Sequence, residues 1–283
     1  MTIRTALRVA AGALVWAAAC TRQATAQLYP AQPARYLLTT EAADARALWV
    51  NPAGLARRPE ASIGGDATVD RTSGTLRLSQ VGLSLQSRGL AFGWSRNSYP
   101  GGLSASSYAL GVGFGDEALS VGATRHWYRG GRSATAWDVA VRARTTPAVD
   151  VSVVWRLIGS PVMRDTVFHV FRTWPSSIVP AASLRLFGGR LRLTAEAEVE
   201  SRLSHVREVR TGVALALGGG FDLTLRGDFS PSFDRRGFAF ALSWDRTRSR
   251  TALTTILPAD AGSLDAVGAT GFLVSALPTR RLR

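Results

Sequence analysis

Three histidines carry the side chains most readily used for catalysis or metal binding: His126, His169 and His205. No H-x-x-H or H-E-x-x-H spacing joins any two of them, so the sequence predicts no metal site. His126 lies in phase with Ser120, but six residues of extended chain span about 20 Å, too far for a Ser–His pair. We therefore predict that the protein is not an enzyme and uses no cofactor. A hydrolase that pairs His126 or His169 with a serine from another strand is the alternative.

The basic residues are unusual in kind as well as in number. Lys and Arg together number 34, all of them Arg, and the formal net charge is +14. A chain without lysine cannot form a Walker-type phosphate loop, a Schiff-base lysine or a Ser–Lys dyad. The arginines are scattered singly along extended segments, which does not favour nucleic acid as a partner. Outer-membrane lipid, including lipopolysaccharide, and internal carboxylates are the partners that this charge predicts.

Residues 1–26 have the parts of a secretory signal peptide. Arg4 and Arg8 precede an apolar run, Val9–Cys20, and "ATAQ" offers a cleavage site after Ala26. The run is too short to span a bilayer as a helix, which needs about 20 residues. Lipoprotein processing at Cys20 is the alternative. Because Cys20 is the only cysteine, we expect no disulfide and no thiolate metal site in the mature chain.

From residue 60 onward, apolar and polar residues alternate. In the segment 191–200, apolar residues at odd positions alternate with Arg, Thr and Glu at even positions. A period of two indicates a strand with one apolar and one polar face. The same pattern predicts strands near 61–70, 74–86, 89–96, 106–115, 118–128, 134–144, 149–157, 178–187, 190–200, 207–217, 220–229 and 237–246, with weaker ones near 249–257 and 267–275.

Strand length and connections favour a membrane barrel over a soluble β-sandwich or lipocalin-like barrel, which would turn the apolar face inward. Tight turns such as "GDE" and "FGGR" alternate with longer loops, and the strands are about ten residues long. Aromatic residues stand near strand ends, where interfacial girdles lie: Trp94, Trp127, Tyr128, Trp137, Trp155 and Trp244. We predict an all-β fold, a transmembrane antiparallel up-and-down β-barrel.

Such a barrel encloses the polar faces of its strands. The inward set combines arginines with carboxylates: Arg142, Arg144, Arg156, Arg185, Arg192, Arg210 and Arg226 with Asp150, Glu196, Glu198, Glu200, Asp222 and Asp228. Bidentate Arg–carboxylate pairs can brace an interior of this kind. Two interpretations fit this inward set of charges: a structural ion-pair network, and a path that selects anionic or carboxylate-bearing solutes. The glycines of "GVGFGDEALSVG" fall on an inward face, which predicts small-residue packing and not a phosphate loop.

The stretch "TTEAADARALWVNPAGLARRPEASIG", residues 39–64, resembles the N-terminal region of FadL-type and PorV-type outer-membrane barrels. In these families an N-P-A-G element follows a small-residue-rich, partly helical stretch and precedes the first strand. Weaker similarity covers residues 119–161 and 180–199. The chain is also similar to the barrel-like region of some SppA-type proteins, but it has no Lys for that family's dyad.

The resemblance implies a barrel of about 14 strands, with residues 27–59 folded into the lumen as a hatch and the barrel itself in residues 60–283. Its hatch element would be Asn51, Pro52, Ala53 and Gly54. The C-terminal "LPTRRLR" lacks the terminal aromatic usual in such barrels, whereas "FAFALSW" has one. Closure at that strand, with 12 strands, is therefore the alternative.

FadL-type members move fatty acids and other hydrophobic compounds across the outer membrane, whereas PorV-type members serve protein export or surface attachment. We accordingly expect a bacterial outer-membrane barrel that binds or transports a hydrophobic or amphipathic small molecule through a lumen gated by the hatch. A non-transporting scaffold that binds an export-machinery protein is the alternative.

Overall fold

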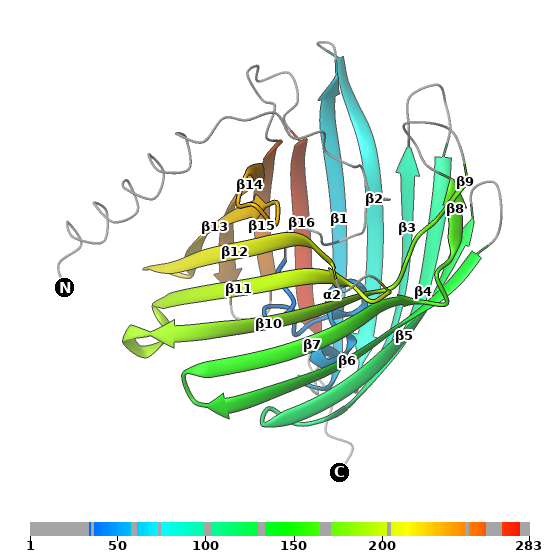
Figure 1. Ribbon diagram of the computed structural model, residues 1–283. Coiled ribbons are helices and arrows are strands. Elements are labelled where there is room, and N and C mark those ends of the chain that lie inside the picture. The colour runs from blue at the N-terminus through cyan, green and yellow to red at the C-terminus, as the bar shows by residue number, and fades with distance from the viewer. Residues whose placement is uncertain are drawn as a thin grey trace.

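The computed structural model describes Ala34 and residues 37–57, 61–72, 75–98, 104–129, 134–164, 171–202, 205–246, 249–258 and 268–277. The predicted signal peptide, Cys20 and His169 lie outside this part of the chain. Fourteen antiparallel strands form a closed barrel (Figure 1). They are β1 (Ala61–Thr72), β2 (Thr75–Ser87), β3 (Leu90–Ser98), β4 (Ser104–Gly115), β5 (Leu119–Arg129), β6 (Ala134–Thr146), β7 (Val149–Ile158), β10 (Ser177–Leu186), β11 (Leu191–Glu200), β12 (His205–Gly218), β13 (Phe221–Phe229), β14 (Arg235–Arg246), β15 (Ser249–Pro258) and β16 (Gly268–Leu277).

Strand β1 closes the barrel because it pairs with β2 on one side and with β16 on the other. Ser62 lies opposite Gln86 of β2 and Ala276 of β16. The remaining strands pair in chain order, except that β8 (Val162–Arg164) and β9 (Phe171–Thr173) form a separate hairpin within the connection from β7 to β10. The predicted all-β, up-and-down barrel is therefore confirmed, and β15 and β16 belong to it.

The two ends of the barrel differ in their connections. One end carries tight turns, including residues 88–89, 116–118, 147–148 and the 3-10 turn η3 (Phe187–Gly189). In the 116–118 turn the Asp116 carboxylate accepts backbone N–H groups of Ala118 and Leu119 at 2.8 and 3.0 Å. These two hydrogen bonds, that from Leu119 first, lower the pKa of Asp116. Short turns mark the periplasmic end of outer-membrane barrels.

Each strand has a buried polar face and an exposed apolar face, as the alternation predicts. In β5 the inward Ser120, Thr124 and His126 are at most 4% exposed, whereas the outward Leu119 and Val121 are 56% and 44% exposed. Exposed Phe92, Leu110, Phe114, Val139, Val141, Val153, Phe240 and Leu242 continue this apolar exterior around the barrel. A polar interior and an apolar exterior are what a membrane-spanning barrel requires.

Two residues near the long-loop end depart from the predicted faces. Leu157 is only 5% exposed and has a φ of 53°, because β7 bulges where Trp137 pairs with Ile158 and Val139 with Trp155. The bulge lets the Leu157 N–H donate to Asp138 Oδ1 at 2.8 Å. Tyr128, predicted to join the outer aromatic girdle, instead stacks on inward-facing His126 with ring centroids 6.0 Å apart.

The core of the molecule is the segment inside the barrel. We call Ala34 and residues 37–57, the described part of the predicted hatch, the plug. It contains helix α2 (Ala47–Val50), which packs on β3 and β4, and the 3-10 helix η1 (Pro52–Ala56), which packs on β4, β5 and β6. Figure 1 shows this blue segment enclosed by the strands. Within the described residues, neither helix has the length and hydropathy of a membrane span.

Candidate functional site

The N-P-A-G element lies at the centre of the plug and is completely buried. Asn51 is 0% exposed, and its Oδ1 accepts the Ala53 N–H at 3.1 Å, which caps η1. Pro52 begins η1, where its missing N–H is not needed. The Asn51 side-chain amide donates to the Thr39 carbonyl oxygen at 2.9 Å. Gly54 packs against the Ala42 carbonyl oxygen so closely that a Cβ would collide with it. The element therefore ties the plug to its own preceding turn.

Glycines on the barrel wall make room for the plug. We call the inward face of β3, β4 and β5 the seat. A Cβ on Gly111 would lie 2.6 Å from Leu48 Cδ1, and one on Gly113 would lie 2.8 Å from the Ala56 nitrogen. A Cβ on Gly122 would lie 2.6 Å from the Ala53 nitrogen. The predicted small-residue packing is confirmed, and its purpose is to admit the backbone of α2 and η1.

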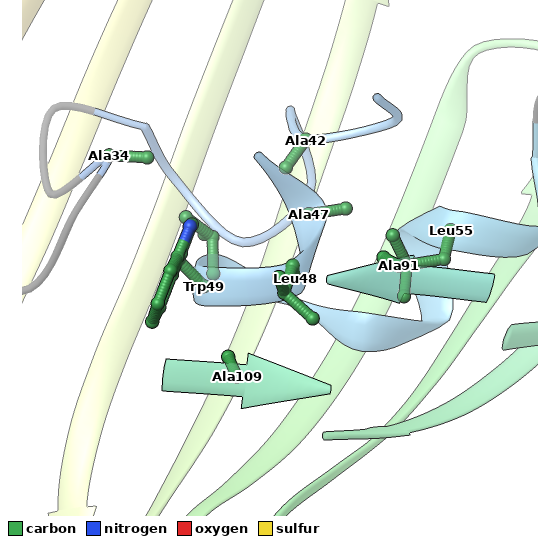
Figure 2. Close-up of a cluster of buried hydrophobic side chains, with 9 residues drawn as sticks. Ala34, Ala42, Ala47, Leu48, Trp49, Leu55, Ala91 and Ala109 are labelled. Carbon is green, nitrogen blue, oxygen red and sulfur yellow. The ribbon is translucent and has the colours of Figure 1, made fainter. Parts of the chain in front are cut away.

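Apolar packing completes the seat. Leu48, Trp49 and Leu55 of the plug are 0%, 5% and 0% exposed and pack with Ala91 of β3 and Ala109 of β4 (Figure 2). Burying side chains of this size stabilises the packed state by about 1.5–3 kcal/mol each. This packing makes the seat a close, largely apolar contact between plug and wall.

Polar side chains from the same half of the barrel bind the plug's carbonyl oxygens. Thr124 donates to the Leu48 oxygen at 3.3 Å, Gln86 to the Leu55 oxygen at 3.1 Å and Arg156 to the Val50 oxygen at 3.0 Å. Arg142 donates to the carbonyl oxygens of Ala42, at 2.9 Å, and Thr40. Two arginines predicted to pair with carboxylates thus act as tethers for the plug.

A cluster of arginines surrounds Asp150 near the short-turn end. The Asp150 carboxylate is completely buried. It forms ion pairs with Arg57 at 3.1 Å, Arg144 at 3.6 Å and Arg142 at 3.9 Å, and it is in close contact with Arg185. Arg144 also pairs with the exposed Glu117 at 2.6 Å. Arg192 lies opposite Arg185 on the neighbouring strand. Arginines outnumber carboxylates in this cluster, which we call the cationic mouth.

Carboxylates dominate the inward faces of β11 and β12 toward the long-loop end. Arg210 pairs with Glu196 at 2.7 Å and with Glu208 at 3.9 Å. Arg207 pairs with Glu200 at 2.6 Å and with Glu198 at 3.8 Å. In the adjacent β13, Arg226 pairs with Asp228 at 2.7 Å, while Asp222 lies nearer the short-turn end, opposite Ala216 and Ser243. We call these inward side chains of β10–β13 the charged wall.

The plug reaches the charged wall through residues 37–42, which we call the strap. The Thr39 N–H donates to Glu196 Oε2 at 2.7 Å, and a Cβ on Gly212 would lie 2.6 Å from Leu38 Cδ1. Two strands away from β11, Ser152 of β7 donates to the Thr39 hydroxyl at 3.2 Å. The strap therefore lies against the neighbouring strands from β7 to β12.

His126 is part of a buried polar group. Its Nε2 lies 3.1 Å from Asp138 Oδ2 of the adjacent strand, and its ring lies 5.9 Å from that of Trp49 in the plug. Among the described residues, no serine or threonine hydroxyl bonds to His126, and no three potential ligands are grouped for a metal. The partnership with Asp138 was missed from the sequence because it joins two strands. His205 is exposed at the start of β12.

No protein-family model and no curated protein sequence matches the chain. Among solved structures, it is similar to a deletion mutant of the TodX monoaromatic hydrocarbon channel, with 12% identity and a TM-score of 0.52, over 82% of this chain and 94% of that one. It is likewise similar to the P. putida toluene transporter TodX, with 12% identity and a TM-score of 0.51, over 83% and 95% of the two chains. The chain therefore has the fold of an outer-membrane β-barrel, and its apolar exterior suits that membrane.

Proposed function

We propose that the protein is an outer-membrane channel for amphipathic anions, and that its plug closes the lumen until the strap moves. The asymmetry of the lumen supports this function most directly. The seat holds α2 and η1 by close packing against glycine and alanine and by a hydrogen bond from Thr124, whereas the strap meets the charged wall through one hydrogen bond and one apolar contact. A closed channel needs one part of its plug that can leave its place, and the strap is that part.

Arg142 gives a solute the means to release the strap. Its guanidinium donates to the carbonyl oxygens of Thr40 and Ala42 and lies 3.9 Å from Asp150. A carboxylate or sulfonate accepts charge-assisted hydrogen bonds that are stronger than those to a neutral carbonyl oxygen. An arriving anion therefore competes with the strap for Arg142, and the freed strap opens the space along the charged wall.

The solute class follows from two features of the molecule. The cationic mouth attracts anions to the short-turn end, because its arginines exceed its carboxylates. Release of the strap exposes Leu38, which is completely buried while the strap is in place, to the apolar body of a solute. A solved barrel of this fold is described as a monoaromatic hydrocarbon channel. This favours an aromatic group as the apolar part of the solute.

Liposomes bearing the protein test the proposal with two permanently charged probes of similar size, benzenesulfonate and phenyltrimethylammonium. We expect the sulfonate to enter faster, and we expect Arg185→Gln to reduce that preference. Arg88→Gln, which removes an exposed charge from a turn at the same end, should leave it unchanged. Equal entry of both probes would contradict the anion preference.

A non-transporting scaffold for an export or surface-attachment partner is the second candidate, and the complete burial of the N-P-A-G element favours it. In that case both probes would stay outside the liposomes and planar bilayers would show no conductance. A protein crosslinked to the barrel in cells would then identify the partner.

A further inference from the structure

An arginine faces outward from the membrane-spanning wall. Arg125 of β5 is exposed on the outer face, and its register neighbours are Leu110 on one side and Trp137 on the other. Its guanidinium carbon lies 5.2 Å from the ring centroid of Trp127 and 5.5 Å from that of Trp137. Cation–π contacts of this kind hold the charge in place but do not neutralise it.

The surroundings of Arg125 form an ordered surface. One register step toward the long-loop end, Trp94, Tyr108 and Trp127 form a row across β3, β4 and β5. One further step out, Arg96 and Arg129 flank Ser106 in the next row. The outward residues beside Arg125 and toward the barrel middle are apolar: Phe92 and Leu110 stand in its own register row, and Val121 lies four residues along β5. We call this patch the arginine belt.

The described surface around Arg125 offers this arginine no counter-charge. The described outward positions of β3, β4, β5 and β6 include no Asp or Glu, and among the described residues no carboxylate lies within salt-bridge distance of Arg125. An arginine on the lipid-facing side of a barrel is destabilising to an extent that depends on its depth. Arg125 lies just inside the aromatic row, so a negative group from the membrane itself would offset that penalty.

We propose that the arginine belt binds a phosphorylated, multiply acylated lipid of the outer leaflet. One of its phosphates accepts hydrogen bonds from Arg125 and a second phosphate accepts them from Arg96, while its acyl chains lie over Phe92, Leu110 and Val121. The belt stands at the long-loop end, which faces the outer leaflet in outer-membrane barrels. The proposal is independent of what the lumen carries.

Native mass spectrometry of the purified full-length protein in detergent tests the site, with bisphosphorylated lipid A as the probe. We expect Arg125→Leu to retain this lipid about tenfold less well than the wild type, because a hydrogen-bonded charge pair is lost. The leucine suits a lipid-facing position, so the variant should fold, and its heat-dependent mobility in gels checks that it does. Arg190→Gln is the control, because it removes an exposed arginine at the short-turn end.

Two further measurements decide whether the phosphate is what the belt recognises. We expect the wild type to bind lipid A without phosphates weakly. Its affinity for that lipid should be no higher than the affinity of Arg125→Leu for bisphosphorylated lipid A. Arg96→Gln should weaken binding in the same direction. Equal retention by wild type and Arg125→Leu, equal loss in Arg190→Gln, or undiminished binding of the dephosphorylated lipid would each overturn the proposal.

Discussion

The seat and the charged wall face each other across one lumen and hold the plug by different means. The seat offers glycine and alanine, and Gly111, Gly113 and Gly122 bring the wall backbone within contact of α2 and η1. The charged wall offers long side chains, and its Glu196 accepts a hydrogen bond from the strap. Close-packed surfaces transmit strain and resist movement, whereas a charge-assisted bond can be exchanged for another. The comparison suggests that one side fixes the plug and the other lets it be released.

Removing the charged wall's contact with the strap should have the largest effect. Glu196→Ala leaves buried Arg210 without its partner at 2.7 Å and the Thr39 N–H without an acceptor. Breaking a buried ion pair costs about 3–5 kcal/mol. We expect a lower Tm and frequent channel opening in planar bilayers.

Glu208→Ala is the matched control for this prediction, because Glu208 lies 3.9 Å from the same arginine and, within the described part of the chain, accepts no hydrogen bond from the strap. It should lower the Tm less and leave the channel closed. If the Glu208→Ala channel opens and the Glu196→Ala channel does not, the strap does not hold the channel closed.

Filling the seat should have the next largest effect. Gly122→Val places a side chain where Pro52 and Ala53 lie, and overpacking of this kind costs about 1–3 kcal/mol. We expect a displaced plug and a permanently raised conductance. Gly65→Val is the control, because a Cβ there would meet nothing nearer than the Gly82 oxygen at 3.9 Å. A closed Gly122→Val channel would show that the seat does not hold the plug.

The internal fastening of the plug should contribute less than either wall. Asn51→Ala removes the cap of η1 and the bond to Thr39, and a lost cap costs about 0.5–2 kcal/mol. Asn51→Ser should recover part of the Tm, since serine also caps helices. If Ser and Ala variants melt at the same temperature, the cap contributes nothing measurable.

The turn that bears Asp116 lies outside both walls and should show the smallest effect. Its pKa is lowered in the folded state, so the stabilisation is present above the unfolded pKa of about 4 and disappears as the pH falls through the lowered value. The difference in Tm between wild type and Asp116→Asn should therefore shrink below that pH. A difference that grows on acidification would contradict the assignment.

The sequence predicted the barrel and its two faces because a period of two is a local property of each strand. It also placed Arg142, Arg156 and Glu196 on the inward face, where an ion-pair network or a path for anionic solutes was expected, and Glu196 does pair with Arg210. The structure shows Arg142 and Arg156 bonding to plug carbonyl oxygens, which depends on where another segment folds. The His126–Asp138 pair and the bulge at Leu157 likewise arise from pairing between strands. Periodicity carries no information about such cross-strand partners.

Two engineered disulfides test most directly whether the strap moves while the seat stays. The first joins Leu38→Cys to Gly212→Cys across the strap and the charged wall, and the second joins Leu48→Cys to Gly111→Cys within the seat, both with Cys20→Ser. In each pair, the leucine Cδ1 lies 2.6 Å from the place that a Cβ added to the glycine would occupy. We predict that oxidising the first pair stops benzenesulfonate uptake by liposomes and that reduction restores it, while the second pair leaves uptake unchanged. Uptake that persists through the locked strap, or stops only when the seat is locked, would contradict the account.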